Sequence, residues 1–397
     1  MAVQFDSNFP SLTFEAEFPA PVGTVDITDY VISAGMFHGR SREVDRYDAR
    51  GTFVLDNWDG RFTPGNSSSP YASGGANFVR PRVRINVRAV WAATTYYLHA
   101  GRATVWQDDW KAQGFDPTVT LSTTGLISDL ARWIGQPLTT PVGSEEFSGA
   151  RVDRILTAAS WAGGTSIGTG LVRLAETDLG GNGITLLEQV IDAEGGAFWI
   201  DPDGTAVFED RAALVANSRS NSSQVTFSQA SVFFRDARPS SGEDTLYNVI
   251  TIGRAGGAEQ TATDATSVAA YGALSYARTG LPALDDVDSM AVAEYNLARF
   301  KDPDARVAEL TIDPASSPTL MWPHALGRRI RDRATVTAYV PRSATTESES
   351  VFIEGVGHQI SQNSWTTSFT FSNAAPWNGF TTSVWDTGVW DTAKWYF

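Results

Sequence analysis

The sequence predicts a mainly β protein with some α-helix, in which two related small β-barrel domains flank a mixed α/β insertion. Segments in which apolar and polar residues alternate with period two, as in strands, gather toward both ends of the 397-residue chain. Amphipathic segments of helical period lie mostly between those ends. The composition, with 35 Gly, 13 Trp and 21 Phe, favours strands joined by many turns.

These patterns divide the chain into four parts. We expect a first β-barrel at 1–124, a mixed α+β insertion at 125–240, a second β-barrel with one helix at 241–375, and a Trp-rich C-terminal tail at 376–397. More than one domain is expected at this length, because single hydrophobic cores stop growing beyond ~250–300 residues.

The first region contains the clearest strand pattern, at 79–88 (VRPRVRINVR). The apolar residues of this run share one face of the predicted strand, and four arginines share the other. Those arginines are Arg80, Arg82, Arg84 and Arg88. An earlier strand ends at the turn signal Asp56–Asn57. A hairpin is predicted at 91–95, with further strands at 96–105 and 114–123.

The insertion contains most of the helix signals. Three helices are predicted: 125–136, a stretch near 152–159 with Ser148 as its cap, and one that begins with a capping box at 185–188 and ends at Gly195–Gly196. A hairpin follows and turns at 201–204. A fourth helix, 289–300, lies beyond the insertion, and 215–223 and 253–267 are predicted to be loops.

The second β-rich region is predicted to contain strands at 328–338, 350–361 and 364–372. Its last two strands can be laid beside the first region. Residues 101–110 followed by 119–122 match 355–365 followed by 369–372: a strand leaves a Gly, turns near a Trp and returns as an alternating strand. Either the match is a chance likeness between β-meanders, or the chain carries two related barrels.

Composition also limits the functions available to the chain. A net charge of −15 argues against binding of free nucleic acid, because phosphate binding needs a basic surface. An acidic surface suits solubility, and it equally suits a channel wall along which DNA slides without sticking. The chain has no Cys, which excludes disulfides and thiol nucleophiles. It has no secretory signal and no apolar run long enough to cross a membrane, so we expect folding in a cytoplasm.

No catalytic pattern has the required context. The G-x-S-x-G match at 164–168 follows a helix-like segment and precedes a strand-like one, which reverses the order that a nucleophile elbow needs. The four His residues have no ligand spacing, and the turn at 201–204 lacks the later ligands of a calcium loop. We therefore expect no enzyme, no metal and no cofactor.

The C-terminal tail repeats the motif Val-Trp-Asp-Thr and ends Lys-Trp-Tyr-Phe. Its three tryptophans are Trp385, Trp390 and Trp395. Such an apolar patch is unfavourable in water. The tail either folds back on its own domain or docks its tryptophans on a neighbouring subunit or partner protein. A sugar-stacking role is a third alternative.

A series of short motifs, taken in their order along the chain, resembles the tail hub or minor tail proteins (baseplate hub family) of long-tailed phages that infect actinobacteria. The motifs are Asp26–Val31, Gly39–Glu43, Leu55–Asn57, Gly60–Phe62, Arg80–Arg82, Leu186–Gly196, Asp203–Phe208 and Ser267–Gly272. None of them is specific alone; their order carries the resemblance.

The resemblance implies a structural protein of the virion, located at the tail tip and assembled in the host cytoplasm without membrane insertion. It implies a homotrimer whose subunits each contribute two barrel-like tube domains, so that six barrels match a sixfold tail tube to a threefold tip. The implied partners are the distal tail protein, other tail-tip proteins and the tape measure protein. Phage DNA would pass through the channel without specific binding.

On this reading the arginine face (Arg80, Arg82, Arg84 and Arg88) is a candidate subunit interface that pairs with acidic residues of an adjacent barrel. The alternative is a solvated strand face. Two rivals to the hub are a distal tail protein, which would form hexamers, and a carbohydrate-binding receptor protein, which only the terminal tryptophans favour. The chain carries no lysozyme-like or peptidase segment, so a cell-wall hydrolase comes last.

Overall fold

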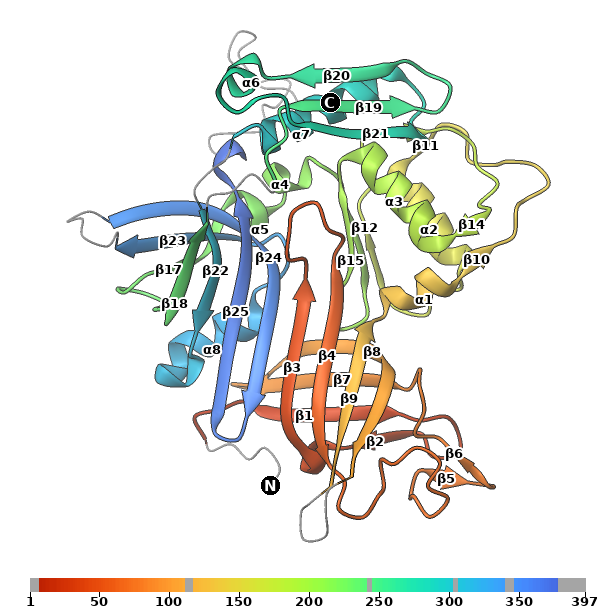
Figure 1. Cartoon of the computed structure of the whole chain (residues 1–397), viewed down its shortest axis with the longest axis vertical. Helices are drawn as coiled ribbons and strands as arrows, with labels where there is room; N and C mark the ends of the chain where they lie inside the picture. Colours follow the sequence, from red (N-terminus) through yellow and green to blue (C-terminus); the bar gives the residue numbers. More distant parts are fainter. Residues whose placement is uncertain (1–6, 111–116, 241–244, 303–305, 340–345, 378–397) are drawn as a thin grey trace.

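The computed structural model describes residues 7–110, 117–240, 245–302, 306–339 and 346–377. The protein is mainly β, as predicted, and its largest sheet has 13 strands. All neighbouring strands of this sheet are antiparallel except β17 and β23, which run parallel. The sheet curls across the middle of the molecule, and the helices gather mainly at its upper part (Figure 1).

Six strands in the first part of the chain form what we call the first unit. They are β1 (Ser11–Glu17), β3 (Val31–Gly39), β4 (Asp48–Asp56), β7 (Arg84–Trp91), β8 (Thr94–Asp109) and β9 (Thr118–Gly125). Their order in the sheet is β3-β4-β9-β8-β7-β1. Short elements decorate this unit: β2 (Thr24–Asp26), η1 (Thr28–Tyr30), β5 (Ala72–Ser73) and β6 (Ala76–Asn77).

Six strands near the other end of the chain form the second unit. They are β17 (Ser223–Phe227), β18 (Asp236–Ser240), β22 (Arg306–Ile312), β23 (Arg333–Tyr339), β24 (Thr346–Ser361) and β25 (Ser364–Asn373). Their order is β18-β22-β25-β24-β23-β17. Numbered along the chain, the strands of both units follow the order 2-3-6-5-4-1. The two units differ in the direction of the first strand, because β1 is antiparallel to β7 whereas β17 is parallel to β23. The two segments matched in the sequence fall on β8–β9 and β24–β25, the fifth and sixth strands of each unit.

The two units form one sheet because β3 pairs with β24 over Ala34–Gly39 and Gly355–Ile360. The prediction of two separate barrels therefore needs correction: within the described ranges, no strand pairing closes either unit into a barrel. The second strand of the first unit is bound to the fifth strand of the second unit, so the sheet continues where a barrel would close. A single apolar cluster, with Phe14, Phe53, Trp322 and Phe369 among its members, serves both units.

The insertion lies between the two units along the chain and contains five helices. Its elements are α1 (Ile127–Arg132), β10 (Ile134–Gly135), β11 (Glu146–Phe147), α2 (Ser148–Ala158), β12 (Thr165–Ile167), β13 (Arg173–Leu174), β14 (Gly181–Asn182), α3 (Gly183–Glu194), β15 (Ala197–Ile200), β16 (Ala206–Glu209), α4 (Ala213–Ala216) and α5 (Ser218–Asn221). Strands β17 and β18, from the range first assigned to the insertion, belong to the sheet of the second unit.

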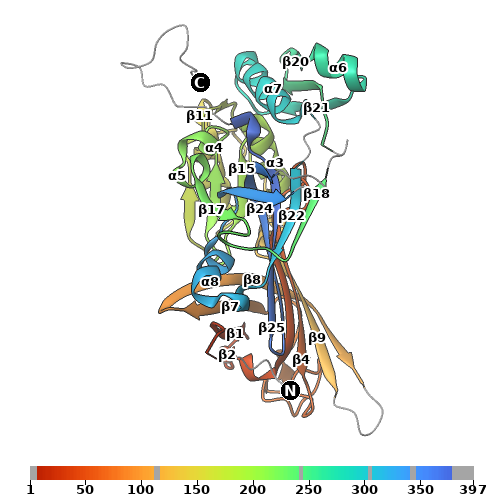
Figure 2. The same ribbon diagram turned by 90° about the vertical axis from the view of Figure 1, so that its left-hand side faces the viewer.

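A second excursion separates β18 from β22. It comprises β19 (Val249–Arg254), β20 (Glu259–Thr263), α6 (Ala265–Tyr271), β21 (Ser275–Leu281) and α7 (Asp286–Phe300). Its apolar residues share a core with the insertion, where Ile250 and Val292 join Leu187 and Phe208. Together they occupy the end of the molecule opposite β5 and β6 (Figures 1 and 2). The remaining elements are η2 (Pro314–Ser316), α8 (Pro318–Gly327) and η3 (Ala375–Trp377).

At the helix ends, some of the predicted capping signals are confirmed and others are wrong. Helix α3 ends at Gly195 with a left-handed φ of 68°, as predicted, but its N-cap is Asn182, whose side chain accepts from the Ile184 N–H. The predicted capping box at 185–188 lies inside the helix. Ser148 does not cap α2, because its hydroxyl donates to buried Glu194 at 2.7 Å. Asp285 caps α7 through the Asp288 N–H.

Two predicted loops are wrong, because 215–223 contains α5 and 253–267 contains β20. Both segments are rich in small polar residues, and tertiary contacts outweigh that local preference. No helix in the described part of the chain is long and apolar enough to span a membrane. The tail tryptophans Trp385, Trp390 and Trp395 lie outside the described residues.

Candidate functional site

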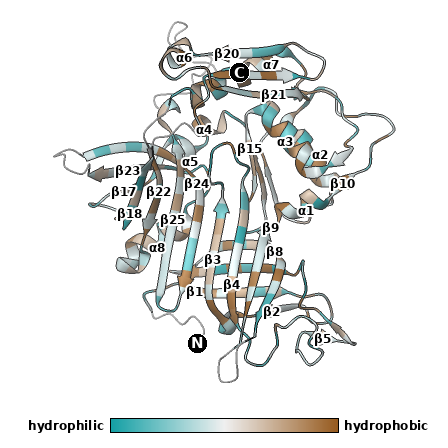
Figure 3. Cartoon of the chain, in the orientation of Figure 1, coloured by the Kyte–Doolittle hydropathy of each residue, from teal (hydrophilic) through white to brown (hydrophobic). Residues whose placement is uncertain are grey.

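The face of the joined sheet that points away from the core forms a shallow groove of about 810 Å³. Strand alternation places small and polar side chains on this side of β25, β24, β3 and β4, while their apolar neighbours point into the core. The two kinds of residue alternate as paler and brown bands along the strands (Figure 3). We call this surface the polar face; it includes Ser33, Gly35, Thr52, Gly357, Gln359, Ser361, Ser364, Thr366, Ser368 and Thr370.

Phe37 crosses the joint between the two units on the polar face. It lies opposite Gly357 on β24 and Arg50 on β4. The Arg50 guanidinium carbon is 5.0 Å from the centroid of the Phe37 ring. A Cβ atom on Gly355 would lie 2.6 Å from that ring, so the glycines of β24 leave the space that it occupies. Phe37 therefore covers the joint from the groove side.

The backbones of β3 and β24 also approach closely at Gly39. This residue has φ of 142°, and a Cβ on it would lie 2.2 Å from the Gly355 Cα. Only glycine fits this combination of dihedral angle and space. The joint between the units thus depends on glycines from both strands.

The groove carries little charge. Among its lining residues only Arg50 and Glu309 are ionisable, and the rest are hydroxyl, amide, glycine or apolar residues. Glu309 lies beside Arg238 at 3.1 Å. The net charge of −15 is therefore not concentrated on this surface. A hydroxyl surface without a cluster of Lys and Arg offers few phosphate contacts.

A buried cluster of charged residues ties the end of the joint together. Glu354 on β24 accepts from Arg40 Nε at 2.7 Å, from the Tyr47 hydroxyl and from the Ser372 hydroxyl. Burial alone would raise the pKa of Glu354, but attraction to Arg40 outweighs it and lowers that pKa to about 2. Arg299 from α7 lies 3.7 Å from the same carboxylate. The sequence patterns did not point to this cluster, which joins three distant segments.

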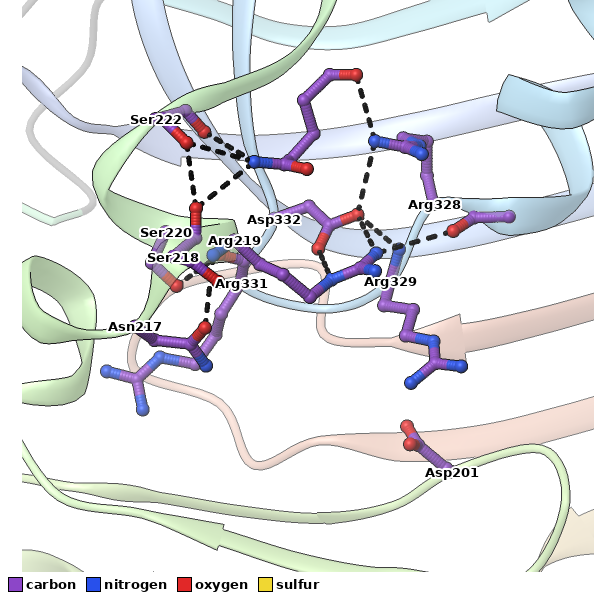
Figure 4. Close-up of polar contacts among 12 residues, drawn as sticks. Asp201, Asn217, Ser218, Arg219, Ser220, Ser222, Arg328, Arg329, Arg331 and Asp332 are labelled. Atoms are coloured by element: carbon purple, nitrogen blue, oxygen red, sulfur yellow. Dashed lines mark hydrogen bonds and ion pairs between the residues drawn. The ribbon is translucent and has the colours of Figure 1, made fainter.

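A second polar cluster fastens the insertion to the second unit (Figure 4). Asp332, before β23, accepts two hydrogen bonds of 2.5 Å from Arg219 of α5 and one of 3.0 Å from the Arg329 N–H. Arg329 points toward Asp201, at the turn of the β15–β16 hairpin. Burial raises the pKa of Asp201, while a hydrogen bond from Trp199 opposes that shift. These contacts hold the insertion in a fixed place beside the sheet.

Three of the four histidines are buried in the core side of the sheet. Burial lowers the pKa of His38 and of His358 to about 4 and that of His99 to about 3. His38 Nε2 lies 2.9 Å from the Ile200 carbonyl oxygen, and His99 Nε2 lies 2.8 Å from the Thr123 hydroxyl. They are packed residues. Within the described ranges, no group of three or more His, Asp or Glu side chains could hold a metal ion.

The predicted arginine face is only partly one surface. Strand β7 begins at Arg84, and Arg82 precedes it with φ of 76°, so the predicted strand start at 79 is wrong. Arg82 contacts Asp129 of the insertion, whereas Arg84 lies 3.7 Å from Glu17 and Arg88 lies 2.8 Å from Glu15 on β1. Arg80 lies in the turn before β7, with its guanidinium carbon 5.6 Å from the centroid of the Phe78 ring. In the sequence, Glu15 and Glu17 alternate along β1. This pattern of acidic residues could have indicated the contacts of β1 with Arg84 and Arg88.

Comparison with solved structures finds a similar fold in bacterial and prophage tail proteins. The tail protein from Neisseria meningitidis MC58 matches with a TM-score of 0.58 and 11% identity, covering 91% of this chain and 96% of that one. The chain shares its fold with this tail protein. The 43 kDa tail protein of prophage MuSo2 from Shewanella oneidensis matches with a TM-score of 0.54 and 12% identity, over 92% and 98% of the two chains.

A third match is the prophage tail protein gp18 from Listeria monocytogenes EGD-e, with a TM-score of 0.50 and 10% identity over 91% of this chain and 94% of that one. No protein-family model matches the sequence. No curated protein matches it either. The likeness is therefore one of fold.

Proposed function

We propose that this chain is a structural protein of a phage tail tip, a hub that joins the tail tube to the tip and lines the DNA exit channel. The observation that carries the proposal is the internal duplication: two six-stranded units of the same strand order lie side by side in one sheet. The fold shared with three tail proteins over most of their length supports the same role. On this account the chain works by shape and has no catalytic activity.

The duplication suits a threefold assembly. Three copies would present six similar units around one axis, which matches a sixfold tube to a threefold tip. Within the described residues the joined sheet ends at β18, at β2 and, on a branch, at β17. Symmetric association would cover such open edges. The expected partners are the distal tail protein, other tail-tip proteins and the tape measure protein.

We assign the polar face to the wall of the channel. The groove is concave and lined by hydroxyl, amide and glycine groups, with Arg50 stacked on Phe37. The hydroxyl and amide groups of such a wall form hydrogen bonds with water as readily as with DNA. The wall also has few cations that could bind phosphates. DNA would pass along it without specific binding.

Two further contacts belong to the proposal. The arginine face, of which Arg84 and Arg88 lie on β7, is a candidate second contact between subunits. The tail tryptophans Trp385, Trp390 and Trp395 are candidate anchors on a partner. If those tryptophans bind sugars, the chain is a carbohydrate-binding receptor protein; if the particle is a hexamer, it is a distal tail protein.

Electron microscopy of the purified chain tests the proposal. We expect ring-shaped particles with a central channel and threefold symmetry, in which six similar lobes surround the channel. Antibodies against the chain would label the tip of phage tails and not their shafts. Rings with sixfold symmetry built from six chains would favour the distal tail protein, and label along the shaft would contradict the hub.

A further inference from the structure

The fifth strands of the two units differ in what lies beside them. In the second unit, the first half of β24 pairs with β23 and its second half pairs with β3, while β25 follows on the other side. In the first unit, the first half of β8 pairs with β7, over Thr94–Arg102. Ala103 exchanges backbone hydrogen bonds with Arg82 and Val83, just before β7. From Thr104 to Asp109, β8 pairs with β9 and, within the described ranges, with no other strand.

The second strands show the converse difference. Strand β3 lies between β24 and β4, whereas β18 pairs with β22 alone and forms one end of the sheet. The open half of β8 and the open side of β18 lie toward opposite sides of the molecule (Figure 1). Within the chain, the equivalent edges of β3 and β24 pair with each other.

From these two differences we propose that β18 of one copy pairs, antiparallel, with the second half of β8 of the next copy, repeating the β3–β24 joint between chains. The partner is a second copy of this chain. The inference rests on the proposed function, because it specifies how three copies would close into a ring.

Equivalent rows of residues across the two units set the register of this pairing. One row of the first unit runs Gly35, Thr52, Ser122, Val105 along β3, β4, β9 and β8. The corresponding row of the second unit runs Arg238, Glu309, Thr370, Gly355 along β18, β22, β25 and β24. Both rows reach the fifth strand just after an irregularity in its pairing, at Ala103/Val105 and Ile353/Gly355.

Within the chain, Gly35 lies opposite Gln359, four residues beyond Gly355. The same offset places Arg238 of one copy opposite the residue four beyond Val105 of the next, which is Asp109. Alternation puts Arg238 and Asp109 on the same face of their strands. The register derived from the joint therefore sets a cation opposite an anion.

The chemistry of both edges fits such a contact. Arg238 is exposed, and its pairs with Glu309 and Asp236 are surface pairs that contribute little. Trp110, directly after β8, is 82% exposed and would face Ala237 in this register. Pro239 cannot donate a backbone hydrogen bond, so the added ladder is short. A short, charged edge disfavours uncontrolled aggregation while permitting one specific pairing.

Disulfide trapping tests the pairing, since the chain has no Cys of its own. The variant Arg238→Cys/Asp109→Cys places two thiols directly opposite each other, where Cβ atoms of paired strands are about 4.5–5.5 Å apart. Oxidation is expected to give a covalent trimer on a non-reducing gel. The matched control, Arg238→Cys/Val105→Cys, moves one thiol four residues along the same face, about 13 Å away, and is expected to stay monomeric on the gel.

The oligomeric mass of the wild-type chain, measured alongside, separates the two claims. A trimer in solution whose Asp109 variant does not cross-link would overturn the strand pairing and leave the proposed function standing. A wild-type chain that stays monomeric would overturn both. Equal cross-linking of the Val105 control would overturn the register.

A charge swap gives an independent measurement. Arg238→Asp and Asp109→Arg are each expected to weaken the trimer, and the double variant to restore its mass. Both side chains are exposed, so neither change should unfold the subunit. Single variants that assemble like the wild type would contradict the pairing.

Discussion

The two six-stranded units share one strand order and differ at their edges. The second strand of the first unit, β3, is glycine-rich and buried against β24, with Gly39 and Gly355 in close approach and the Glu354 cluster beside them. Its counterpart β18 carries exposed Arg238 and ends in Pro239 and Ser240. The same position is thus built as a permanent joint inside the chain and as a polar, open edge at its end. This difference suggests that one contact forms on folding and the other on assembly.

Removing the buried charge at the joint is expected to have the largest effect. Glu354→Gln leaves Arg40 and Arg299 without their shared carboxylate in a dry site, so we expect a loss of about 3–5 kcal/mol in the free energy of unfolding. Denaturant unfolding followed by tryptophan fluorescence measures it. The control is Asp45→Asn, which breaks the exposed pair Arg42–Asp45 and should change stability by less than about 0.5 kcal/mol. Equal losses in both variants would show that the Glu354 carboxylate contributes no more to stability than an exposed ion pair does.

Crowding the joint is expected to have the next largest effect. A methyl group in Gly39→Ala would overlap the Gly355 Cα and force a φ of 142° on a residue that avoids it. We expect a loss of about 2–4 kcal/mol, from strain and overpacking together. Gly65→Ala is the matched control, because Gly65 also has positive φ, of 80°, but no atom within 4 Å of the added methyl. Its loss should be about 1 kcal/mol.

Acid is expected to weaken both units through their buried histidines. The pKa of His99 is about 3 and those of His38 and His358 about 4 in the folded chain, against 6.5 for the free side chain. Below pH 6.5 the histidines of the unfolded chain bind protons, whereas the buried histidines of the folded chain stay neutral. The free energy of unfolding therefore has its full value above pH 6.5 and falls as the pH drops toward 4. Each residue contributes about 1.4 kcal/mol per pH unit over this window.

The measurement is the midpoint of denaturant unfolding between pH 7.5 and pH 5. His99→Asn is expected to reduce the slope with pH, whatever it does to stability at pH 7.5. A midpoint that does not change with pH would contradict burial of these imidazoles in neutral form.

The smallest effect is expected at the arginine face. The side chains of Arg88 and Glu15 are 41% and 22% exposed, so their pair is screened by water. Arg88→Ala should lower the free energy of unfolding by less than about 1 kcal/mol. Charge reversal at Arg84 and Arg88 then tests the interface: a trimer whose mass is unchanged would remove this face from the subunit contacts.

The sequence predicted the elements whose signals are local. Alternation and turn residues located the β8–β9 and β24–β25 strands and the β15–β16 hairpin, and Gly195 marked the end of α3. The joint of the units could not be predicted in this way, because β3 and β24 are separated by some 300 residues of chain and no local pattern pairs Gly39 with Gly355. Capping was wrong at Ser148 because the hydroxyl serves a distant carboxylate, Glu194.

The candidate site, too, could be predicted only where its pattern is local in the sequence. The hydroxyl alternation of β25 is visible in Ser364–Asn373, but only the fold shows that it continues across β24, β3 and β4 as one groove. Period two predicted that Arg84 and Arg88 share one strand, and both lie on β7. Their role as a subunit interface stays a prediction. The predicted strand position is wrong for Arg82, because the positive φ at that residue turns the side chain toward Asp129 of the insertion.

On the proposed function, two equivalent units in one chain build a ring of six from three copies. Native mass spectrometry of the full chain measures the number of copies in the assembled particle. We expect three copies per particle, and a single copy when Arg238 is reversed in charge. A stable particle of two or six copies, or a chain that remains single at all concentrations, would contradict the proposed function.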